Sequence, residues 1–503
     1  MAAPQNTPVK EGYKQFDFTE EVLQTFREQS VIPIDFYNRD GQILIHKKEG
    51  ASTDDINRLL RFEAQGIFFR NEDYEKLFSK QSSRPTHVNG REVSFTKLVN
   101  VDLTKDLAKD TKNLLGELKT SPFQGRQFAN VSKSIDNILT DFSNSNDVET
   151  GLVNIIEVMG GTNAGVDSEI ITKRTVIGMA LKLRGMKAIS RAEKEIQKAE
   201  QMTMMMSSYL CDIGYSQMKI PEHGNISVEE YNYIKNHPMV SYLMLAPLEE
   251  IDTKIKSNVL NHHRPYKGES LNNNYPSAKV IVEKLSVLQK KYSEDSGKAH
   301  IARDITQQIK HILTYTGYEE DTGIISIAGE FAAMTTAKPW RDAMDSMTAM
   351  KIILNNSFFT YNEKIVKDFF DYVGHSLCDN RSILNRGDYV ITAHSDSGKK
   401  VHFEICIIVS INRSQTRPML ERIGTIQPIF SNVKKLEIKD FNLTTMKLDR
   451  RKARYNLESG DPRRIVFIVD PGLNPILFDE IDQQYRRTNP KNAETTSKVE
   501  SKQ

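Results

Sequence analysis

The pattern of hydrophobic and polar residues first changes near residue 90. Apolar, β-rich runs at 31–37 and 43–45 flank the turn-forming residues Asn38-Arg39-Asp40-Gly41, a pattern that predicts a β-hairpin. A helical pattern follows, and the run Ile67-Phe68-Phe69 then predicts a further strand. We therefore expect a small α/β module over residues 1–90.

The middle of the chain is helical in pattern and the last part is not. Residues 91–164 carry apolar side chains at helical spacing in a polar background and are expected to be a helical connector. Residues 165–375 have few strand signals and predict a helical bundle. Residues 384–485 alternate β-rich runs with turn residues and predict a small β domain, and the polar residues 486–503 predict a disordered tail. The expected protein is multidomain and mainly α.

Composition narrows the possible partners. The 503 residues are 38% hydrophobic and 27% charged with a formal net charge of +2, so no general electrostatic attraction to DNA or RNA is expected. Three cysteines without a CxxC spacing indicate a reducing compartment, which we take to be the cytoplasm. No apolar run approaches the roughly 18 residues of a membrane helix, so no membrane insertion is expected.

Candidate chemistry is concentrated in the helical region. Cys211-Asp212, His237-Pro238 and His262-His263 supply metal-ligand side chains. Adjacent residues on a regular helix point about 100° apart, so the histidine pair serves one ion only at an irregular turn. Alone, the pair is more often structural. More informative is the order of the segments CDIGYSQMKIP, NHP, NHHRPYKG, NNNYP and SIAGEFAAMTTAKPWR.

Over residues 165–374 these segments resemble the HD-GYP family. That family's pattern runs His-Asp-x-Gly-Lys, Ile-Pro, His-Pro, His-His-Glu, Gly-Tyr-Pro and a last segment ending in Arg-Pro-Tyr-Arg. The positions that match it are Asp212, Ile213, Gly214, Ile220, Pro221, His237, Pro238, His262, His263, Tyr275, Pro276, Ala328, Phe331, Ala333, Thr335, Pro339 and Arg341. The resemblance implies an HD-GYP-like helical bundle, and residues 277–320 are expected to be an insertion in it.

The same resemblance implies metal-dependent hydrolysis of cyclic di-GMP, but the site departs from the family's pattern. Family members use two or three metal ions to activate water and hold phosphate oxygens. Here Cys211 replaces a histidine, Tyr215 a lysine and Gly329 a metal-binding aspartate, while Thr172 falls on a ligand histidine. Glu169 is a possible substitute carboxylate.

The remaining donors predict one metal ion or none. Asp212, His237, His262 and His263 supply about enough ligands for one Zn, Fe or Mn ion. Cys211 could join them as a thiolate, which would favour Zn or Fe, and the alternative is a buried structural cysteine in an inactive site.

Four further residues are candidate phosphate contacts. The resemblance places Arg264 and Lys267 at acidic positions of the family's pattern, which makes the cleft more basic. Arginine offers a planar fork to phosphate oxygens, although a solvated charged surface is the commoner explanation. Tyr275 and Arg341 complete the candidate set.

Three functions remain open. The first is a divergent HD-GYP-like binding or regulatory module of cyclic-dinucleotide signalling, with impaired or no phosphodiesterase activity. The second is an active metal-dependent phosphodiesterase that converts cyclic di-GMP to a linear dinucleotide or GMP. The third is a scaffold that docks a protein partner and needs neither metal nor nucleotide.

Overall fold

Two compact units divide the chain, residues 1–94 and residues 95–503. In this computed structural model the described residues of the first unit are 13–16, 26, 31–38, 41–52, 55–56, 67–70, 73, 86–88 and 91–93. Those of the second unit are 101–144, 165–183, 191–219, 226–263, 277–314, 319–374, 377–378, 382–395, 401–412, 414–428 and 441–488.

The first unit contains a small antiparallel sheet. Its strand order is β1 (Tyr13–Phe16), β6 (Ile67–Arg70), β3 (Phe36–Tyr37) and β4 (Ile43–Ile45). Strands β3 and β4 pair around the predicted turn, so the structure contains the predicted hairpin. Two further strand pairs are β2 (Val31–Ile32) with β5 (Lys48–Glu49), and β7 (Thr86–Val88) with β8 (Arg91–Val93).

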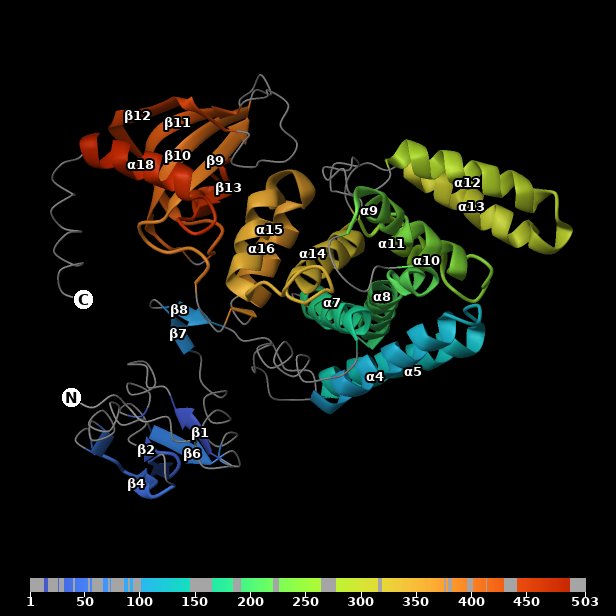
Figure 1. Cartoon of the computed structure of the whole chain (residues 1–503), viewed down its shortest axis with the longest axis horizontal. Coiled ribbons are helices and arrows are strands. Elements are labelled where there is room, and N and C mark those ends of the chain that lie inside the picture. The colour runs from blue at the N-terminus through green and yellow to red at the C-terminus, as the bar shows by residue number, and fades with distance from the viewer. Residues whose placement is uncertain are drawn as a thin grey trace. The chain divides into compact units, whose positions relative to one another are not determined.

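Helices make up the first part of the second unit, as the sequence predicted (Figure 1). They are α4 (Val101–Leu118), α5 (Gly125–Asn144), α7 (Val166–Leu183), α8 (Arg191–Leu210), α9 (Val228–Ile234), α10 (His237–Leu245), α11 (Thr253–Asn261), α12 (Ala278–Ser293), α13 (Ala299–Leu313), α14 (Glu320–Met334), α15 (Ser346–Thr360) and α16 (Glu363–Asp368). Short turns of other helix types are η4 (Ile213–Gln217), η5 (Ser296–Lys298) and η6 (Phe369–Gly374).

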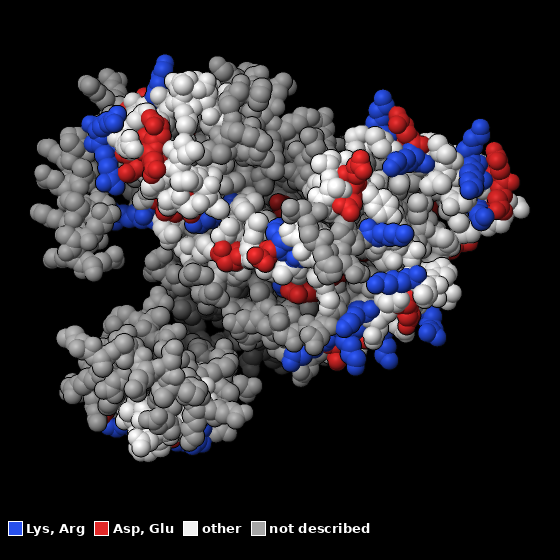
Figure 2. All heavy atoms as spheres, viewed as in Figure 1, with Lys and Arg blue, Asp and Glu red and all other residues white. Residues whose placement is uncertain are grey.

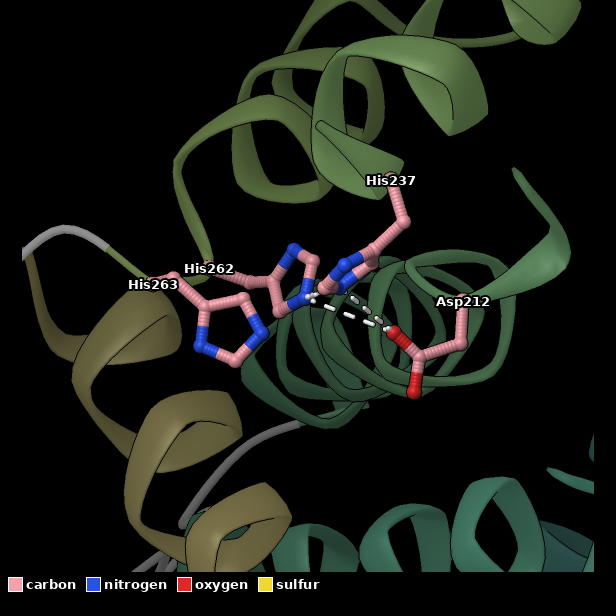
Figure 3. A group of neighbouring side chains, drawn as sticks. All are labelled: Asp212, His237, His262 and His263. Carbon is pink, nitrogen blue, oxygen red and sulfur yellow. Dashed lines mark hydrogen bonds and ion pairs between the residues drawn. The ribbon is translucent and has the colours of Figure 1, made fainter. Parts of the chain in front are cut away.

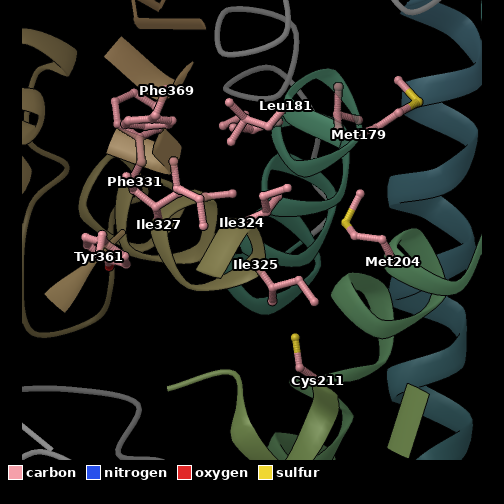
Figure 4. Packing of buried hydrophobic residues seen from close by; sticks show 14 of the residues in the cluster. Met179, Leu181, Met204, Cys211, Ile324, Ile325, Ile327, Phe331, Tyr361 and Phe369 are labelled. Atoms are coloured by element: carbon pink, nitrogen blue, oxygen red, sulfur yellow. The ribbon is translucent and has the colours of Figure 1, made fainter. Parts of the chain in front are cut away.

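Helix α7 is the centre of this helical region. It packs against α4, α8 and α14, and almost all its described residues after Glu169 are buried. Met179, Leu181 and Ile324 are among the apolar side chains at its contacts (Figure 4). Helices α4 and α5 pack on α7 and α8, and their buried leucines belong to the same hydrophobic core. A charged side chain on the inner part of α7 must therefore find its partner inside the protein.

The segment expected to be an insertion forms a helical hairpin. Helices α12 and α13 pack against each other, and α13 also contacts α11 (Figure 1). Inside that contact, the Tyr242 hydroxyl donates a 2.7 Å hydrogen bond to Asp304, and Lys256 lies 3.7 Å from the same carboxylate. Because all three side chains are buried, this polar group anchors the hairpin to the rest of the helices.

The predicted β domain is an antiparallel sheet of five strands. The strands are β9 (Tyr389–Ser395), β10 (Val401–Ser410), β11 (Met419–Pro428), β12 (Phe441–Asn456) and β13 (Arg464–Val469), in the order β12-β11-β10-β9-β13. Helix α18 (Pro475–Thr488) packs its buried face on this sheet. Strand β13 lies against α15, where the backbone N–H of Ile468 donates a 2.7 Å hydrogen bond to Asn355.

Two general properties agree with the expectations from composition. Basic and acidic side chains are interspersed over the described part of the face in Figure 2, as a net charge of +2 suggests. Among the residues that the structure describes, no helix combines the length and the apolar character needed to cross a bilayer.

Candidate metal centre

Four of the predicted ligands converge in the helical region. One donor atom from each of Asp212, His237, His262 and His263 lies within 4.8 Å of the other three (Figure 3). We call these four residues the cluster. The first three side chains are buried and His263 is partly exposed. Residues from three separate segments of the chain therefore meet where a small cation fits.

Helix ends place the cluster. Asp212 lies between the end of α8 and η4, His237 is the first residue of α10, and His262 caps the C-terminus of α11. Helix α11 ends at Asn261, His262 is its C-cap, and His263 follows beyond the helix, where the two ring centroids lie only 4.0 Å apart. This irregular end resolves the difficulty that adjacent helical residues point in different directions.

Backbone carbonyls set the tautomers of two histidines. Nδ1 of His237 lies 3.0 Å from the carbonyl oxygen of Ile234, and Nδ1 of His262 lies 2.7 Å from that of Val259. A carbonyl only accepts hydrogen bonds, so each Nδ1 carries a proton and donates it. In the neutral imidazole the lone pair is then on Nε2, as in a metal-binding histidine.

These lone pairs face one another and a carboxylate oxygen. The Nε2 atoms of His237 and His262 are 3.2 Å apart, and they lie 3.1 Å and 3.5 Å from Oδ1 of Asp212. Within the described part of the chain, that buried oxygen has no hydrogen-bond partner. One shared proton can lie between only two of these acceptors, whereas a metal ion satisfies all three. The donor set therefore fits a divalent ion.

A buried arginine holds the other oxygen of the carboxylate. Nη1 of Arg174 lies 2.6 Å from Oδ2 of Asp212, and its Nε donates a 2.9 Å hydrogen bond to the carbonyl oxygen of Ser208. Burial alone would raise the pKa of Asp212, but the charge of Arg174 opposes it most strongly, and that pKa lies well below its usual range. Asp212 is therefore a carboxylate at neutral pH.

Arg174 was not among the predicted site residues. Its signal in the sequence was the pair Lys173-Arg174 within the apolar stretch around residues 170–181, and the structure buries both side chains. Lys173 instead donates to the carbonyl oxygen of Thr335 and to the hydroxyl of Thr336. Both cations are buried, and only the partners found in the structure separate their roles.

Other groups line the surroundings of the cluster. The Tyr215 ring, at the position of the family's lysine, stacks on the His237 ring with centroids 4.3 Å apart. Burial, and then the charge of Asp212, raises the pKa of Asp167. Burial, and then the charge of Arg341, lowers the pKa of Lys338, while Asp212 acts in the opposite direction. Asp167 and Lys338 thus feel the charge of the cluster, and the sequence had not singled them out.

The structure does not bring Cys211 or Glu169 into the cluster. Cys211 lies among buried apolar side chains (Figure 4), and its thiol donates to the carbonyl oxygen of Ser208 at 3.2 Å. Burial raises the pKa of this thiol to about 12, so it is not a thiolate at neutral pH. Glu169 pairs with Lys173 at 2.6 Å and accepts a 3.2 Å hydrogen bond from Thr336.

The candidate phosphate contacts are mostly outside the described residues. Arg264, Lys267 and Tyr275 all fall there. The partly buried Arg341 donates from its side chain to the carbonyl oxygen of Ala333, and its backbone pairs with Lys338. Arg341 therefore stabilises the turn after α14.

Replacing Gly214 with alanine tests how closely the cluster depends on packing between η4 and α10. A Cβ there would lie 2.7 Å from the His237 carbonyl oxygen and from the backbone nitrogen of Ser241. We expect Gly214→Ala to lower the free energy of unfolding by about 1–3 kcal/mol and to displace His237. The matched control is Gly178→Ala, where the nearest atom is 3.5 Å away, and denaturant unfolding measures both. Equal stabilities for the two variants would contradict this account.

The buried imidazoles predict acid sensitivity of the metal-free protein. Burial lowers the pKa of His262 from 6.5 to about 4, so the unfolded chain takes up its proton at a higher pH than the folded chain. This contribution to stability is complete above pH 6.5 and is lost as pH falls to about 4, on the order of 3 kcal/mol in all. Urea unfolding at a series of pH values measures it. His262→Asn should flatten the dependence, and an unchanged slope would contradict the assignment.

Comparisons with known proteins do not identify this chain. No protein-family model matches it, and no curated protein matches it. One solved structure, described as "Bd1817, a HDG"Y"P protein from Bdellovibrio bacteriovorus", is similar over 73% of this chain and 98% of that chain, with 12% sequence identity and a TM-score of 0.33. At that TM-score the similarity supports no conclusion, so membership of the HD-GYP family remains a prediction.

Proposed function

We propose that this chain is a divergent HD-GYP-like protein whose cluster binds one divalent transition-metal ion. In this proposal it is a binding or regulatory module of cyclic-dinucleotide signalling, with phosphodiesterase activity impaired or absent. The observation that carries the proposal is the mutual approach of Oδ1 of Asp212 and the Nε2 atoms of His237 and His262 within 3.5 Å.

The chemistry of the donors favours a transition metal. Three imidazoles and one carboxylate suit Zn, Fe or Mn better than Mg or Ca, which prefer oxygen ligands. Two of the imidazoles are already oriented by their Nδ1–H bonds to backbone carbonyls. Such orientation raises metal affinity because the ligands lose little freedom on binding.

The surroundings support one ion rather than a pair. Bridging carboxylates join ions that are roughly 3.5–4 Å apart in two-metal hydrolases. Here Oδ2 of Asp212, the oxygen that would bridge, is paired with Arg174. Among the residues that the structure describes, the cluster is the only group of three or more metal-ligand side chains close enough to hold an ion. A single ion favours binding of phosphate over efficient hydrolysis.

A metal ion held there would attract phosphate oxygens and polarise the phosphorus they surround. The chain's own groups would then orient the ligand. Tyr215 presents a ring face beside His237, and the charge of Asp212 reaches Lys338 in the turn after α14. The choice of a cyclic dinucleotide as the ligand rests on the resemblance of the five sequence segments to the HD-GYP pattern.

Elemental analysis of the protein, purified anaerobically without an affinity tag, tests the metal. We expect about one Zn, Fe or Mn ion per chain, and loss of that ion in the double variant His262→Ala with His263→Ala. The matched control changes His300 and His311 to alanine, because both lie outside the cluster. This control should keep the metal. Cyclic di-GMP binding, measured by calorimetry, should follow the metal content of each variant.

Different results select different functions. Protein without metal in the wild type would overturn the proposal and favour a protein-docking scaffold. Stoichiometric metal with sustained release of linear dinucleotide or GMP would replace it by an active phosphodiesterase. Metal that remains bound after His262 and His263 are both changed would show that the site lies elsewhere in the chain.

A further inference from the structure

Arg174 is a permanent positive charge beside the cluster. Its side chain is 2% exposed and pairs with Asp212, whose side chain is 7% exposed. The Ser208 carbonyl oxygen, at the C-terminal end of α8, holds its Nε. Burial alone would lower the pKa of Arg174, but the adjacent carboxylate raises it above its ordinary value. The guanidinium is therefore charged and fixed in place.

The absence of a side chain at Gly329 makes room for this arginine. Helices α7 and α14 pack against each other. A Cβ at Gly329 would lie 3.0 Å from Cδ of Arg174, tighter than nine in ten real Cβ contacts. An alanine there would press on the extended arginine side chain and on its pairing with Asp212. Gly329 and Arg174 thus act as one structural unit.

Arg174 also changes the charge that a metal ion would meet. Asp212 carries one negative charge, and imidazoles that coordinate through lone pairs are neutral. With Arg174 included, the donor set and its immediate partner sum to zero instead of −1. Interactions between buried charges only a few ångströms apart are strong, so this difference is large.

We infer that Arg174 sets the affinity and the metal selectivity of the cluster. It repels a divalent ion bound at Oδ1 of Asp212 and draws electron density from the carboxylate through Oδ2. Ions that depend on a charged oxygen ligand, such as Mn²⁺, lose most by this, whereas Zn²⁺ is held well by neutral imidazole nitrogen. Arg174 therefore biases the cluster toward Zn²⁺, as a positioning residue that does not itself bind the ion. This inference rests on the proposed metal site.

The test measures Zn²⁺ and Mn²⁺ dissociation constants for metal-free wild type, Arg174→Met and Arg174→Lys. Chelator competition measures Zn²⁺, and electron paramagnetic resonance measures free Mn²⁺. We expect Arg174→Met to bind Mn²⁺ at least tenfold more tightly and to show a lower ratio of Zn²⁺ to Mn²⁺ affinity. Arg174→Lys retains the charge and should stay close to wild type. A residue with a merely structural role would instead lose affinity for both ions when it is removed.

Lys182→Met is the matched control. Lys182 is also a buried cation of α7, but it pairs with Asp321 at 2.8 Å and not with the cluster. Its loss should leave both dissociation constants unchanged. Thermal unfolding adds a second readout, because Zn²⁺ should raise the Tm of Arg174→Met more than that of wild type.

Gly329→Ala tests the effect of Arg174 on metal affinity if Arg174→Met does not fold. The added Cβ should shift Arg174 against Asp212 by a few tenths of an ångström while keeping the whole side chain, so the change in metal affinity should be smaller than in Arg174→Met but in the same direction. Equal or weaker Mn²⁺ binding in the folded variants would overturn the inference while leaving the metal site intact. No metal binding by wild type would overturn the proposed function as well.

Discussion

The proposed metal site depends on the different partners of the two oxygens of one buried carboxylate. Oδ2 of Asp212 forms an ion pair with Arg174 at 2.6 Å, while Oδ1 faces the Nε2 atoms of His237 and His262. A buried charge is costly unless it is paired, and the guanidinium supplies that pairing on one side only. The unpaired oxygen is consequently a strong acceptor among lone pairs. This imbalance is the physical basis for a metal ion at the cluster.

The rest of the fold holds these groups in position. Helix α7 is buried among α4, α8 and α14, and it carries Arg174 into the interior. The hydroxyl of Ser241 joins α10 to the turn after α8 and to η4, because it donates to the Cys211 carbonyl oxygen and accepts from the Gly214 N–H. Residues that never touch a ligand therefore fix the separation of Asp212 and His237. Ligand geometry in such a site is a property of helix packing.

Much of the architecture and part of the site followed from sequence. Periodicity separated the helical region from the β domain, and the order of motifs picked out Asp212, His237, His262 and His263, which the structure brings together. Arg174 was missed because a basic residue in a helix is usually interpreted as solvent-exposed, and only tertiary packing shows its burial. The position of Cys211 directly before Asp212 in the sequence could not show that its side chain lies in the apolar core.

X-ray absorption spectroscopy of the zinc-loaded protein would test the central claim, a single ion held by nitrogen and oxygen donors. The account predicts about four light scatterers near 2.0–2.1 Å with the multiple-scattering pattern of imidazole. It also predicts neither a sulfur shell at about 2.3 Å nor a second zinc at roughly 3.5–4 Å. A sulfur shell would show that Cys211 is a ligand of the ion. A metal–metal distance would contradict the assignment of Arg174 to the second oxygen of Asp212.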